Sequence, residues 1–334
     1  MNRLLSEPEL AEFTKGNSII DRLRALLDHQ LDNWSLAAKN YKSLNSIQTK
    51  NLIIDGEEVI LQHNPERVTS TTANVEEKVV KKRKCILCEE NLPEEQRYLN
   101  YYKEYRFIVN PFPILNEHFT VVKTKHTPQA LLDYFNDLLL ISRDVGERYA
   151  VFYNGPKCGA SLPEHLHFQI GNKDQLPIVN QVNLALEKNA NLVAATNKIK
   201  LTSLNSLKRK ALVTESNNSV EILNFFSILN SLLKKAQNNF EEPMFNLVSL
   251  YDKNKWKVII FLRKLHRPSY YYKPVEPQIL VSPASIDMSG LIVAPRRGDL
   301  QKLTPEIIKE IYREVSITKE LNEFLIYQLK NFYN

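Results

Sequence analysis

The segment from Gly159 to Gln169 limits what this chain can fold into more than any other stretch, because polar and apolar side chains alternate in it after a glycine-containing turn. In an extended strand, side chains two positions apart point to the same side. His165, His167 and Gln169 are therefore predicted to share one face. Glycines bracket the segment at positions 155, 159 and 171, three of only eight in the chain. This placement indicates tight turns and close approach of the backbone to a ligand.

Length and charge leave several classes of protein open. A chain of 334 residues can form two ordinary domains or one larger unit built by duplication. Its 43% hydrophobic and 25% charged residues are typical of a soluble globular protein. A net charge of +6 suits a phosphorylated small molecule as well as nucleic acid, and does not decide between them. The basic run from Lys81 to Lys84 is either a phosphate or nucleic-acid contact or a solvated approach to the next strand.

The beginning of the sequence and the cysteines bear on the compartment. Acidic residues and proline interrupt the N-terminus before an apolar core of signal-peptide length can form, and no later stretch approaches eighteen apolar residues. We therefore expect a cytoplasmic protein without a membrane partner. Three cysteines, two of them spaced as Cys85-Ile-Leu-Cys88, do not form a disulfide framework. In a reducing compartment this pair is more naturally half of a metal site.

Patterns along the first half predict helices and then strands. Apolar residues at helical spacing predict one or two helices within residues 8–45. A hairpin follows at residues 51–62, because Asp55-Gly56 fits a primed turn. Three further strands are predicted at residues 105–109, 119–122 and 149–154, and a helix at residues 128–148. We treat residues 1–50 as an N-terminal helical segment and residues 51–175 as the catalytic half.

The second half repeats this order of elements. Residues 176–240 are rich in asparagine, lysine and leucine and are predicted to connect the halves, partly as a helix over residues 220–236. Strands are predicted at residues 244–250, 257–262 and 290–293, and helices within residues 305–329. Residues 241–334 then form the second half. The repeated order predicts an α+β fold built by duplication.

Cys85 and Cys88 offer two soft ligands at a spacing that suits half of a tetrahedral zinc site. Two of the seven histidines are well placed to complete it: His126, between a predicted strand and a predicted helix, and His165, the first imidazole of the motif. Ordinary buried cysteines are the alternative. Such a zinc ion would be structural, because tying His165 to the cysteine loop would orient His167.

His167 is the candidate nucleophile. An imidazole nitrogen that is not occupied by metal can attack phosphorus and hold the transferred group as a phosphoramidate. Gln169 can donate an amide N–H to a phosphate oxygen but cannot exchange a proton at neutral pH, which favours group transfer over hydrolysis. Asn154, Gly159 and Ser161 would add neutral donors to the same phosphates. Turn capping is the alternative role for Asn154 and Ser161.

A cationic cluster follows the predicted strand at residues 257–262, and its members are Arg263, Lys264, His266 and Arg267. These side chains would neutralise a di- or triphosphate. The alternative is a solvated strand end. Asp287, in a nearby segment rich in serine and proline, is either a turn residue or a ligand contact.

Several of these features occur together in one known superfamily. Cys85-x-x-Cys88, Asn110-Pro-Phe-Pro, His118-Phe-Thr-Val-Val, His126 and the stretch from Asn154 to Gln169, in this order, resemble the transferase branch of the histidine-triad superfamily. That branch contains galactose-1-phosphate uridylyltransferase, diadenosine tetraphosphate phosphorylase and the GDP-hexose phosphorylases. Its pattern is His-x-His-x-Gln, where the hydrolases carry a third histidine. One departure is that Ser161 lies six residues before His167, where the uridylyltransferase and diadenosine patterns place a serine five before.

The resemblance implies a duplicated histidine-triad-like fold, with two halves of mainly antiparallel sheet, flanking helices and one active site. It also implies that His167 is the nucleophile and that zinc is bound by Cys85, Cys88, His126 and His165. Residues 110–116 are expected to line the base pocket, with Phe112 and Ile114 as stacking partners beside Asn110.

The function expected from these features is that of a nucleotidyltransferase of phosphorylase type. An NDP-sugar or dinucleoside polyphosphate would give its NMP group to His167, and phosphate or a sugar phosphate would take it away. A hexose-1-phosphate uridylyltransferase is the alternative among enzymes. The alternative of another class is a module that binds nucleotide or nucleic acid without turnover, although His167 and Gln169 argue against it. Both a monomer and a homodimer fit the sequence.

Overall fold

A ten-stranded sheet forms the centre of the protein in a computed structural model, which describes residues 3–73, 77–80, 83–237, 241–274 and 276–333. Its strand order is β3-β4-β5-β7-β6-β11-β12-β10-β9-β8, and every neighbouring pair is antiparallel. The strand bounds are β3 Tyr98–Tyr101, β4 Tyr105–Val109, β5 His118–Lys123, β6 Tyr149–Asn154, β7 His167–Asn172, β8 Leu192–Ala195, β9 Lys200–Leu204, β10 Ala211–Ser216, β11 Phe245–Asp252 and β12 Lys255–Leu262.

The two halves of this sheet have the same topology. In the first half, β3, β4 and β5 are followed by helix α6 (Phe135–Val145) and then by β6 and β7, in the spatial order β3-β4-β5-β7-β6. In the second half, β8, β9 and β10 are followed by α8 (Ser219–Gln237) and then by β11 and β12, in the order β8-β9-β10-β12-β11. The halves meet where β6 pairs with β11. The predicted duplicated α+β fold is confirmed.

The two halves differ in the connection between their last two strands. The connection from β6 to β7 spans residues 155–166, whereas β11 and β12 are joined by a tight turn at Lys253 and Asn254. The long connection carries the glycine-containing segment of the motif, and the second half has no counterpart of it. This explains in structural terms why the motif occurs in one half alone.

Residues 176–240 do more than connect the halves. They contain α7 (Pro177–Glu187), the three strands β8, β9 and β10, and α8. The second half therefore begins near Leu192 and not at residue 241. These strands have a weak sequence pattern because β8 and β9 are short, β8 lies at the edge of the sheet and β9 begins with lysine.

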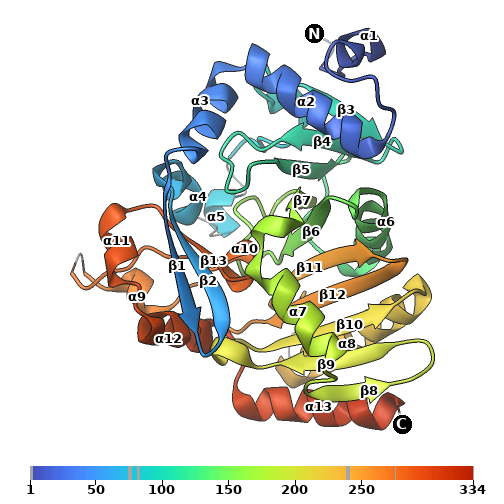
Figure 1. Ribbon diagram of the computed structural model, residues 1–334, viewed down its shortest axis with the longest axis vertical. Helices are drawn as coiled ribbons and strands as arrows, with labels where there is room; N and C mark the ends of the chain where they lie inside the picture. The colour runs from blue at the N-terminus through green and yellow to red at the C-terminus, as the bar shows by residue number, and fades with distance from the viewer. Residues whose placement is uncertain (1–2, 74–76, 81–82, 238–240, 275, 334) are drawn as a thin grey trace.

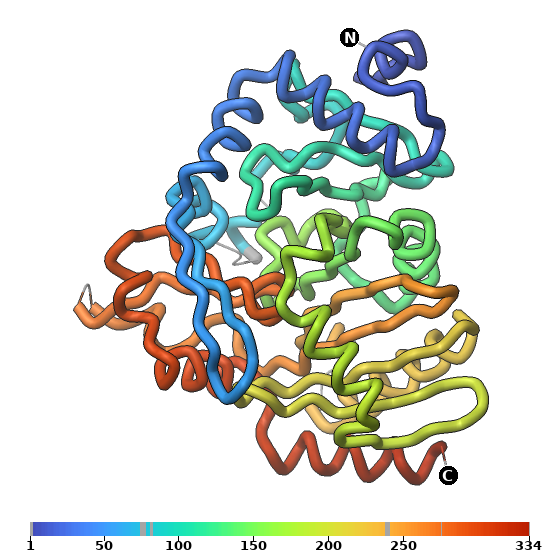
Figure 2. The backbone as a smooth tube through the Cα atoms, viewed as in Figure 1, coloured from blue at the N-terminus to red at the C-terminus, as the bar shows by residue number. Residues whose placement is uncertain are grey.

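Helices cover one face of the large sheet. The N-terminal residues form α1 (Glu7–Ala11), α2 (Ile19–Asn33) and α3 (Ser35–Leu44), where the sequence predicted one or two helices. Apolar residues of α2, α6, α8 and α13 (Lys319–Tyr333) form one core with the inward side chains of the strands. Figures 1 and 2 show this arrangement, with α2 near one end of the long axis and α13 near the other.

A second core covers the opposite face of the second half. It contains apolar residues of α7, α10 (Ser285–Met288) and α12 (Pro305–Val315), together with a three-stranded sheet of order β1-β2-β13. The predicted hairpin is confirmed as β1 (Gln48–Ile54) and β2 (Glu57–His63), with φ of 53° at Asp55 and 81° at Gly56, as a primed turn requires. The predicted strand at residues 290–293 is β13 (Leu291–Ala294), which pairs with β2 and not with the large sheet.

Four short helices complete the description, α4 (Val68–Thr71), α5 (Glu77–Val80), α9 (Ser269–Tyr272) and α11 (Arg297–Lys302). Lys81 and Lys82 of the basic run lie outside the described residues. Among the residues that are described, no helix is both long enough and apolar enough to cross a membrane.

Candidate active site and metal cluster

Strand β7 presents His167 and Gln169 on the face of the sheet away from the core that contains α2, α6, α8 and α13. Phe168 and Ile170, which alternate with them, are fully buried in the core beneath. His165 precedes the first residue of the strand and turns to a separate cluster of cysteine and histidine. The alternation predicted from the sequence therefore holds for His167 and Gln169.

The loop that leads into β7 depends on Gly159. Its φ of +111° is strained for any residue with a side chain. A Cβ atom added there would also lie 2.7 Å from the Cβ atom of Ala284, which is closer than two carbon atoms pack. Gly159 thus lets this loop lie directly against the segment that begins α10.

One contact fixes the tautomer of His167. Its Nδ1 atom lies 2.8 Å from the backbone carbonyl oxygen of His165. Because a carbonyl oxygen only accepts, Nδ1 carries the proton and Nε2 keeps its lone pair. Burial lowers the pKa of His167 from its ordinary value, which favours this neutral form. The ring lines a cavity of about 400 Å³ with the lone pair that a nucleophile needs.

Gln129 holds the end of this strand in place. The ladder between β6 and β7 ends at Phe152 opposite Gln169, so Asn154 and His167 are not paired with each other. Gln129 bridges the gap: its Nε2 donates to the carbonyl oxygens of Asn154 (3.0 Å) and His167 (3.1 Å), and its Oε1 accepts the N–H of His167 (2.9 Å). The buried backbone around His167 is satisfied by this one side chain.

His118 orients the amide of Gln169. The N–H of Ile114 donates to Nδ1 of His118 at 3.2 Å, so the proton of this imidazole is on Nε2. Nε2 in turn donates to Oε1 of Gln169 at 2.8 Å. The NH₂ group of Gln169 is thereby left as the end that can donate to a ligand. Burial, with Arg67 nearby, lowers the pKa of His118 to about 3, which keeps the ring neutral.

Two adjoining cavities lie over this face. The larger, of about 400 Å³, is lined by His167 and Gln169 and has an apolar wall made of Trp34, Leu36, Ile86, Leu87, Ile108, Phe112 and Leu162. The smaller, of about 60 Å³, lies between the β6–β7 connection of residues 155–166, here called the motif loop, and the segments that follow β12. Both cavities are lined by Arg67, Ser70, Ala73, Ser161 and Gln169.

The predicted binding residues divide between these cavities. Asn110 and Phe112 line the larger one, whereas Ile114 lines the smaller one. Ser161 lines both, and the smaller cavity also brings together Asn154, Gly159, His266 and Arg267. Asp287, which the sequence left open, lies there as well.

Asn154 is held so that its NH₂ group faces the smaller cavity. Its Oδ1 atom accepts from Nδ2 of Asn246 (2.9 Å) and from the N–H of Ser285 (2.8 Å). With the oxygen engaged on the protein side, the planar amide turns its donors towards the cavity that it lines.

Arg263 and Lys264 line neither cavity. The Arg263 side chain is fully buried and donates to Oδ1 of Asn246 and to the carbonyl oxygens of Pro283, Leu265, His266 and Val315. Lys264 is exposed and lies in a separate depression near α12. The structure therefore gives Arg263 a place in the framework, where it positions Asn246 behind Asn154.

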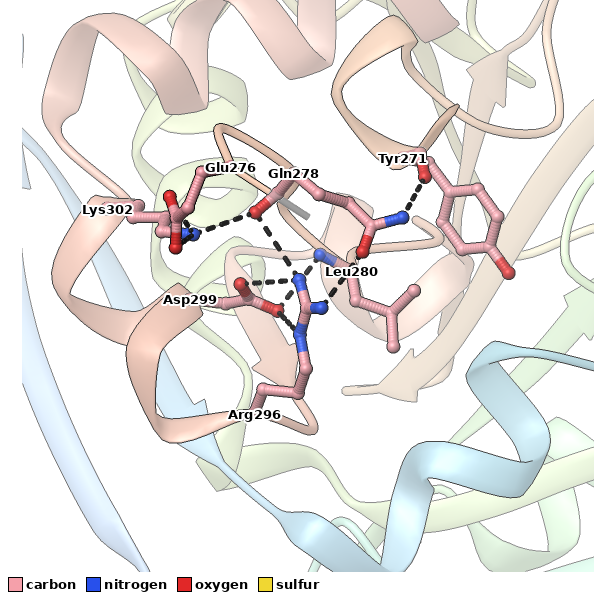
Figure 3. A network of polar contacts seen from close by, with 7 residues as sticks. All are labelled: Tyr271, Glu276, Gln278, Leu280, Arg296, Asp299 and Lys302. Carbon is pink, nitrogen blue, oxygen red and sulfur yellow. Dashed lines mark hydrogen bonds and ion pairs between the residues drawn. The ribbon is translucent and has the colours of Figure 1, made fainter. Parts of the chain in front are cut away.

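A polar network anchors the wall of the smaller cavity. Arg296 contacts both carboxylate oxygens of Asp299 at 2.8 Å, and Oδ2 of this buried aspartate accepts the N–H of Leu280 at 3.0 Å. Arg296 also donates to Oε1 of Gln278 at 2.9 Å, and Figure 3 shows the complete network. It fixes the chain just before residues 282–287, which line the cavity.

The predicted metal ligands lie together. One ligand atom from each of Cys85, Cys88, His126 and His165 is within 4.8 Å of the other three. Sγ of Cys85 is 3.3 Å from Nδ1 of His165, and Sγ of Cys88 is 3.1 Å from Nδ1 of His126. Zinc–sulfur bonds of about 2.3 Å and zinc–nitrogen bonds of about 2.0 Å at tetrahedral angles require sulfur–nitrogen distances of roughly 3.5 Å. The cluster could therefore hold a tetrahedral metal ion.

The surroundings of the cluster also suit a metal. Nε2 of His165 lies 2.7 Å from the carbonyl oxygen of Lys123, which places the proton on Nε2 and leaves Nδ1 free to bind. Arg83 joins the same segments from the other side, because its guanidinium contacts both carboxylate oxygens of Glu164 and the carbonyl oxygen of Ser161. The cysteine loop, residues 85–88, carries Ile86 and Leu87 of the larger cavity. It is joined to the motif loop through the contacts of Arg83 and through the cluster of cysteine and histidine.

Sequence reasoning missed the roles of Arg67, Gln129, His118 and Asn246. Arg67 ends a three-residue 3-10 helix, Gln129 stands in an irregular segment, and Asn246 lies in an ordinary buried strand. His118 alone belonged to a segment of the family pattern, which could have drawn attention to it. Each contacts the site from a distant part of the chain.

Two family models match the sequence, one for each half. A model described as a domain of unknown function, DUF4922, matches residues 26–172, and one described as a GDPGP1-like C-terminal domain matches residues 183–326. A search of curated proteins found no match. The second model begins shortly before β8, in agreement with the start of the second half in the structure.

Solved structures with a similar fold include yeast Ap4A phosphorylase Apa2. Its complex with AMP has a TM-score of 0.55 and 17% sequence identity, over 86% of this chain and 96% of that chain. Its complex with Ap4A has a TM-score of 0.54 and 18% identity, over 87% and 97% of the two chains. The chain therefore matches a GDPGP1-like C-terminal domain over residues 183–326 and shares the fold of yeast Ap4A phosphorylase Apa2.

Proposed function

We propose that the protein is a nucleotidyltransferase of phosphorylase type that works through a nucleotidyl-histidine. An NDP-sugar or dinucleoside polyphosphate gives its NMP group to His167, and phosphate or a sugar phosphate takes it away. The observation that carries the proposal is the state of His167 itself. Its Nδ1–H is engaged by the His165 carbonyl, and its ring lines the larger cavity with Nε2 unprotonated.

The first step needs no proton transfer at His167. Nε2 attacks the α-phosphorus and the bond from phosphorus to the bridging oxygen breaks. Its electron pair leaves with that oxygen, as part of the sugar phosphate of an NDP-sugar or of the remaining nucleoside polyphosphate of a dinucleoside polyphosphate. The imidazole ring gains positive charge, which the His165 carbonyl stabilises through Nδ1–H. The NH₂ group of Gln169, fixed by His118, donates to an oxygen of the transferred phosphate. Because an amide cannot activate water at neutral pH, transfer is favoured over hydrolysis.

The larger cavity suits a nucleoside. Its wall of apolar side chains, Phe112 among them, can pack against a base and a ribose, and Asn110 and Thr120 provide polar groups. A volume of about 400 Å³ is in the range of ligand pockets. The likeness to yeast Ap4A phosphorylase, which was solved with AMP and with Ap4A, supports nucleotide ligands for this cavity.

We propose zinc as the ion of the metal cluster. Two thiolates and two imidazoles are a donor set that zinc prefers, and all four positions are taken by the protein, as in structural sites. Bound there, zinc would hold His165 and the cysteine loop together and so support the wall of the larger cavity. It would not contact the transferred phosphate.

Intact-mass spectrometry tests the covalent intermediate. With a donor and without an acceptor, we expect the wild type to gain the mass of one nucleotide through an acid-labile, base-stable bond, as a phosphoramidate requires. His167→Ala should gain none and lose turnover by several orders of magnitude. His63→Ala is a matched control, since His63 lines neither cavity and should still be labelled. A label that persists in His167→Ala, or that maps to Cys158, would overturn the mechanism.

A substrate panel then identifies the reaction. NDP-glucoses and dinucleoside tetraphosphates are offered as donors, with inorganic phosphate or a hexose 1-phosphate as acceptor, and products are separated by chromatography. Formation of an NDP from phosphate identifies a phosphorylase. Products formed from hexose 1-phosphate alone identify a uridylyltransferase type of reaction, and no turnover with a labelled His167 indicates that the acceptor is missing from the panel.

A further inference from the structure

The smaller cavity lies beside the nucleophile but is lined largely by other parts of the chain. Gln169 and Ser161 line both cavities, so a ligand in the smaller one would be adjacent to a phosphate held on His167. The rest of its lining comes from α4, the motif loop and the segments after β12. The segments after β12 line the smaller cavity and not the larger one, so a nucleoside in the larger cavity does not explain them.

Arg67 is the cation at the junction of the cavities. One of its nitrogen atoms, Nη1, donates to the carbonyl oxygen of Phe112 at 2.9 Å, which fixes the guanidinium in place. Burial lowers its pKa to about 10, so the group is still charged at neutral pH. Arg67 therefore presents a fixed, protonated fork to both cavities, as recognition of a phosphate requires.

Arg267 supplies a second cation from the other half. Its Nε donates to Oγ of Ser282 at 3.1 Å, and its Nη2 donates to the carbonyl oxygens of Thr71 (2.9 Å) and Ala73 (3.0 Å). Its charge is therefore held against the cavity by contacts to neutral groups. The NH₂ group of Asn154 adds an uncharged donor on the opposite wall.

The remaining titratable groups leave the cavity positive. Burial, with Arg267 and Arg263 nearby, lowers the pKa of His266 to about 3, so this ring is neutral. Asp287 is the acidic side chain of the lining. Its carboxylate is turned to the protein, where Oδ2 accepts the N–H of Ala284 and Oδ1 accepts the N–H of Val293, both at 3.0 Å. Two arginines thus face one engaged carboxylate.

The volume of about 60 Å³ indicates the size of the ligand. One water-sized group requires roughly 10–15 Å³ of such space, so the cavity has room for about four to six such groups. A phosphate, with four oxygen atoms around one phosphorus, is of this size. A nucleoside is several times too large.

We propose that the smaller cavity binds the phosphate group of the acceptor, with Arg67 and Arg267 as its cations. This inference rests on the proposed function, because it assumes an NMP group on His167. An oxygen of the bound phosphate attacks the phosphorus of that group, the phosphorus–Nε2 bond breaks, and its electron pair returns to the imidazole. With inorganic phosphate the product is a nucleoside diphosphate, and with a sugar phosphate it is an NDP-sugar.

The test separates the second step from the first. The nucleotidyl form is prepared from three proteins, the wild type, Arg67→Met and Arg67→Lys. Its discharge, which is the transfer of the NMP group from His167, is followed with inorganic phosphate, with glucose 1-phosphate or with hydroxylamine, a neutral nucleophile. We expect the second-order rate constant for inorganic phosphate to fall by roughly 10- to 100-fold in Arg67→Met, as for loss of a charge-assisted contact, and by less in Arg67→Lys. Discharge by hydroxylamine should change little. Arg297→Met, an exposed arginine of α11 that lines neither cavity, is the matched control.

The two acceptors distinguish the source of the phosphate. Discharge by either one that depends on Arg67 supports the proposal, and the acceptor that discharges faster is the substrate class. If both acceptors discharge the nucleotidyl form of Arg67→Met as fast as that of the wild type, the proposal is overturned. It is also overturned if the rate of discharge by hydroxylamine falls as much as the rate with phosphate, because the arginine would then act on the nucleotidyl group alone.

A binding measurement covers the case in which no nucleotidyl enzyme forms. Inorganic phosphate should raise the melting temperature of the wild type and of Arg297→Met in a concentration-dependent way, but not that of Arg67→Met. A phosphate effect without labelling of His167 would contradict the proposed function and leave the anion site standing. Labelling with no phosphate effect, and no dependence of discharge on Arg67, would remove the anion site and leave the proposed function standing.

Discussion

Nε2 of His118 lies 2.8 Å from Oε1 of Gln169, and this contact decides which end of the Gln169 amide meets a ligand. The two residues are 51 positions apart and sit on neighbouring strands, where His118 is opposite Gly171 and Gln169 is opposite Thr120. The N–H of Ile114 fixes the proton on the facing nitrogen of His118. A buried neutral imidazole therefore acts through Gln169 as a positioning residue.

Replacing His118 should slow the first step of the reaction without removing the nucleophile. In His118→Phe the Gln169 amide loses its donor and can rotate, so we expect the single-turnover rate of His167 labelling to fall by roughly 10- to 100-fold. His118→Gln retains an amide donor and should recover part of the rate. Rapid-quench labelling measures both variants. Equal rates in His118→Phe and in the wild type, with both folded by circular dichroism, would show that Gln169 needs no such support.

The same burial predicts how stability depends on pH. Burial lowers the pKa of His118 and of His266 from 6.5 to about 3. Between these values the unfolded chain binds protons that the folded chain does not, so the free energy of unfolding should decrease as the pH falls from 6.5 towards 3. Burial raises the pKa of Asp287 to about 6 and that of Glu242 to about 7. These acids therefore have the opposite effect, because their contribution to the free energy of unfolding increases as the pH falls through these values.

A comparison of variants isolates the histidine contribution. Urea unfolding of the wild type and of His118→Phe at pH 8, 6 and 5 measures the two pH dependences, and the contribution of the acids is common to both proteins. We expect the wild type to lose more stability than the variant between pH 6.5 and 5. Parallel curves would mean that His118 is protonated in the folded protein as readily as in the unfolded chain.

The parts of the site that the sequence predicted are those encoded locally. Alternation along β7 places His167 and Gln169 on one face because Phe168 and Ile170 are buried on the other. The close spacing of Cys85 and Cys88 likewise indicated a metal site. By contrast, Gln129 lies 38 residues from His167, and Asn246 lies 92 residues from Asn154. Such contacts depend on how the strands and loops are brought together, which no short pattern records.

The cationic cluster after β12 shows this limit most clearly. Four residues with similar charge and spacing have three different environments, because Arg263 is fully buried, Lys264 is exposed, and His266 and Arg267 line the smaller cavity. Composition cannot distinguish an arginine that binds phosphate from one that binds carbonyl oxygens. The difference follows from which way the chain turns after Leu262.

Arg263 and Lys264 should therefore respond differently to substitution. Arg263→Met leaves buried carbonyl oxygens without donors, each at a cost of roughly 1–3 kcal/mol, so we expect a large loss of unfolding free energy. Lys264→Met should alter stability by less than about 0.5 kcal/mol, as for most surface changes. Chemical unfolding measures both. An Arg263→Met variant as stable as the wild type, with a raised half-saturation for phosphate, would return Arg263 to a direct role in binding.

Loss of the metal ion proposed for the cysteine and histidine cluster should affect the larger cavity before it affects chemistry at His167. The cysteine loop carries both ligands Cys85 and Cys88 and the cavity residues Ile86 and Leu87, so zinc would hold this wall against the motif loop. We expect about one zinc per chain by elemental analysis of protein purified without added metal. Cys88→Ser should lower the zinc content and the melting temperature, and should raise the half-saturation for the donor more than it lowers the maximal rate of His167 labelling. Thr124→Ser, which retains a hydroxyl near the cluster, is the control and should keep its zinc. A wild type that is folded, labelled at His167 and free of metal would show that the cysteines and histidines pack there without an ion.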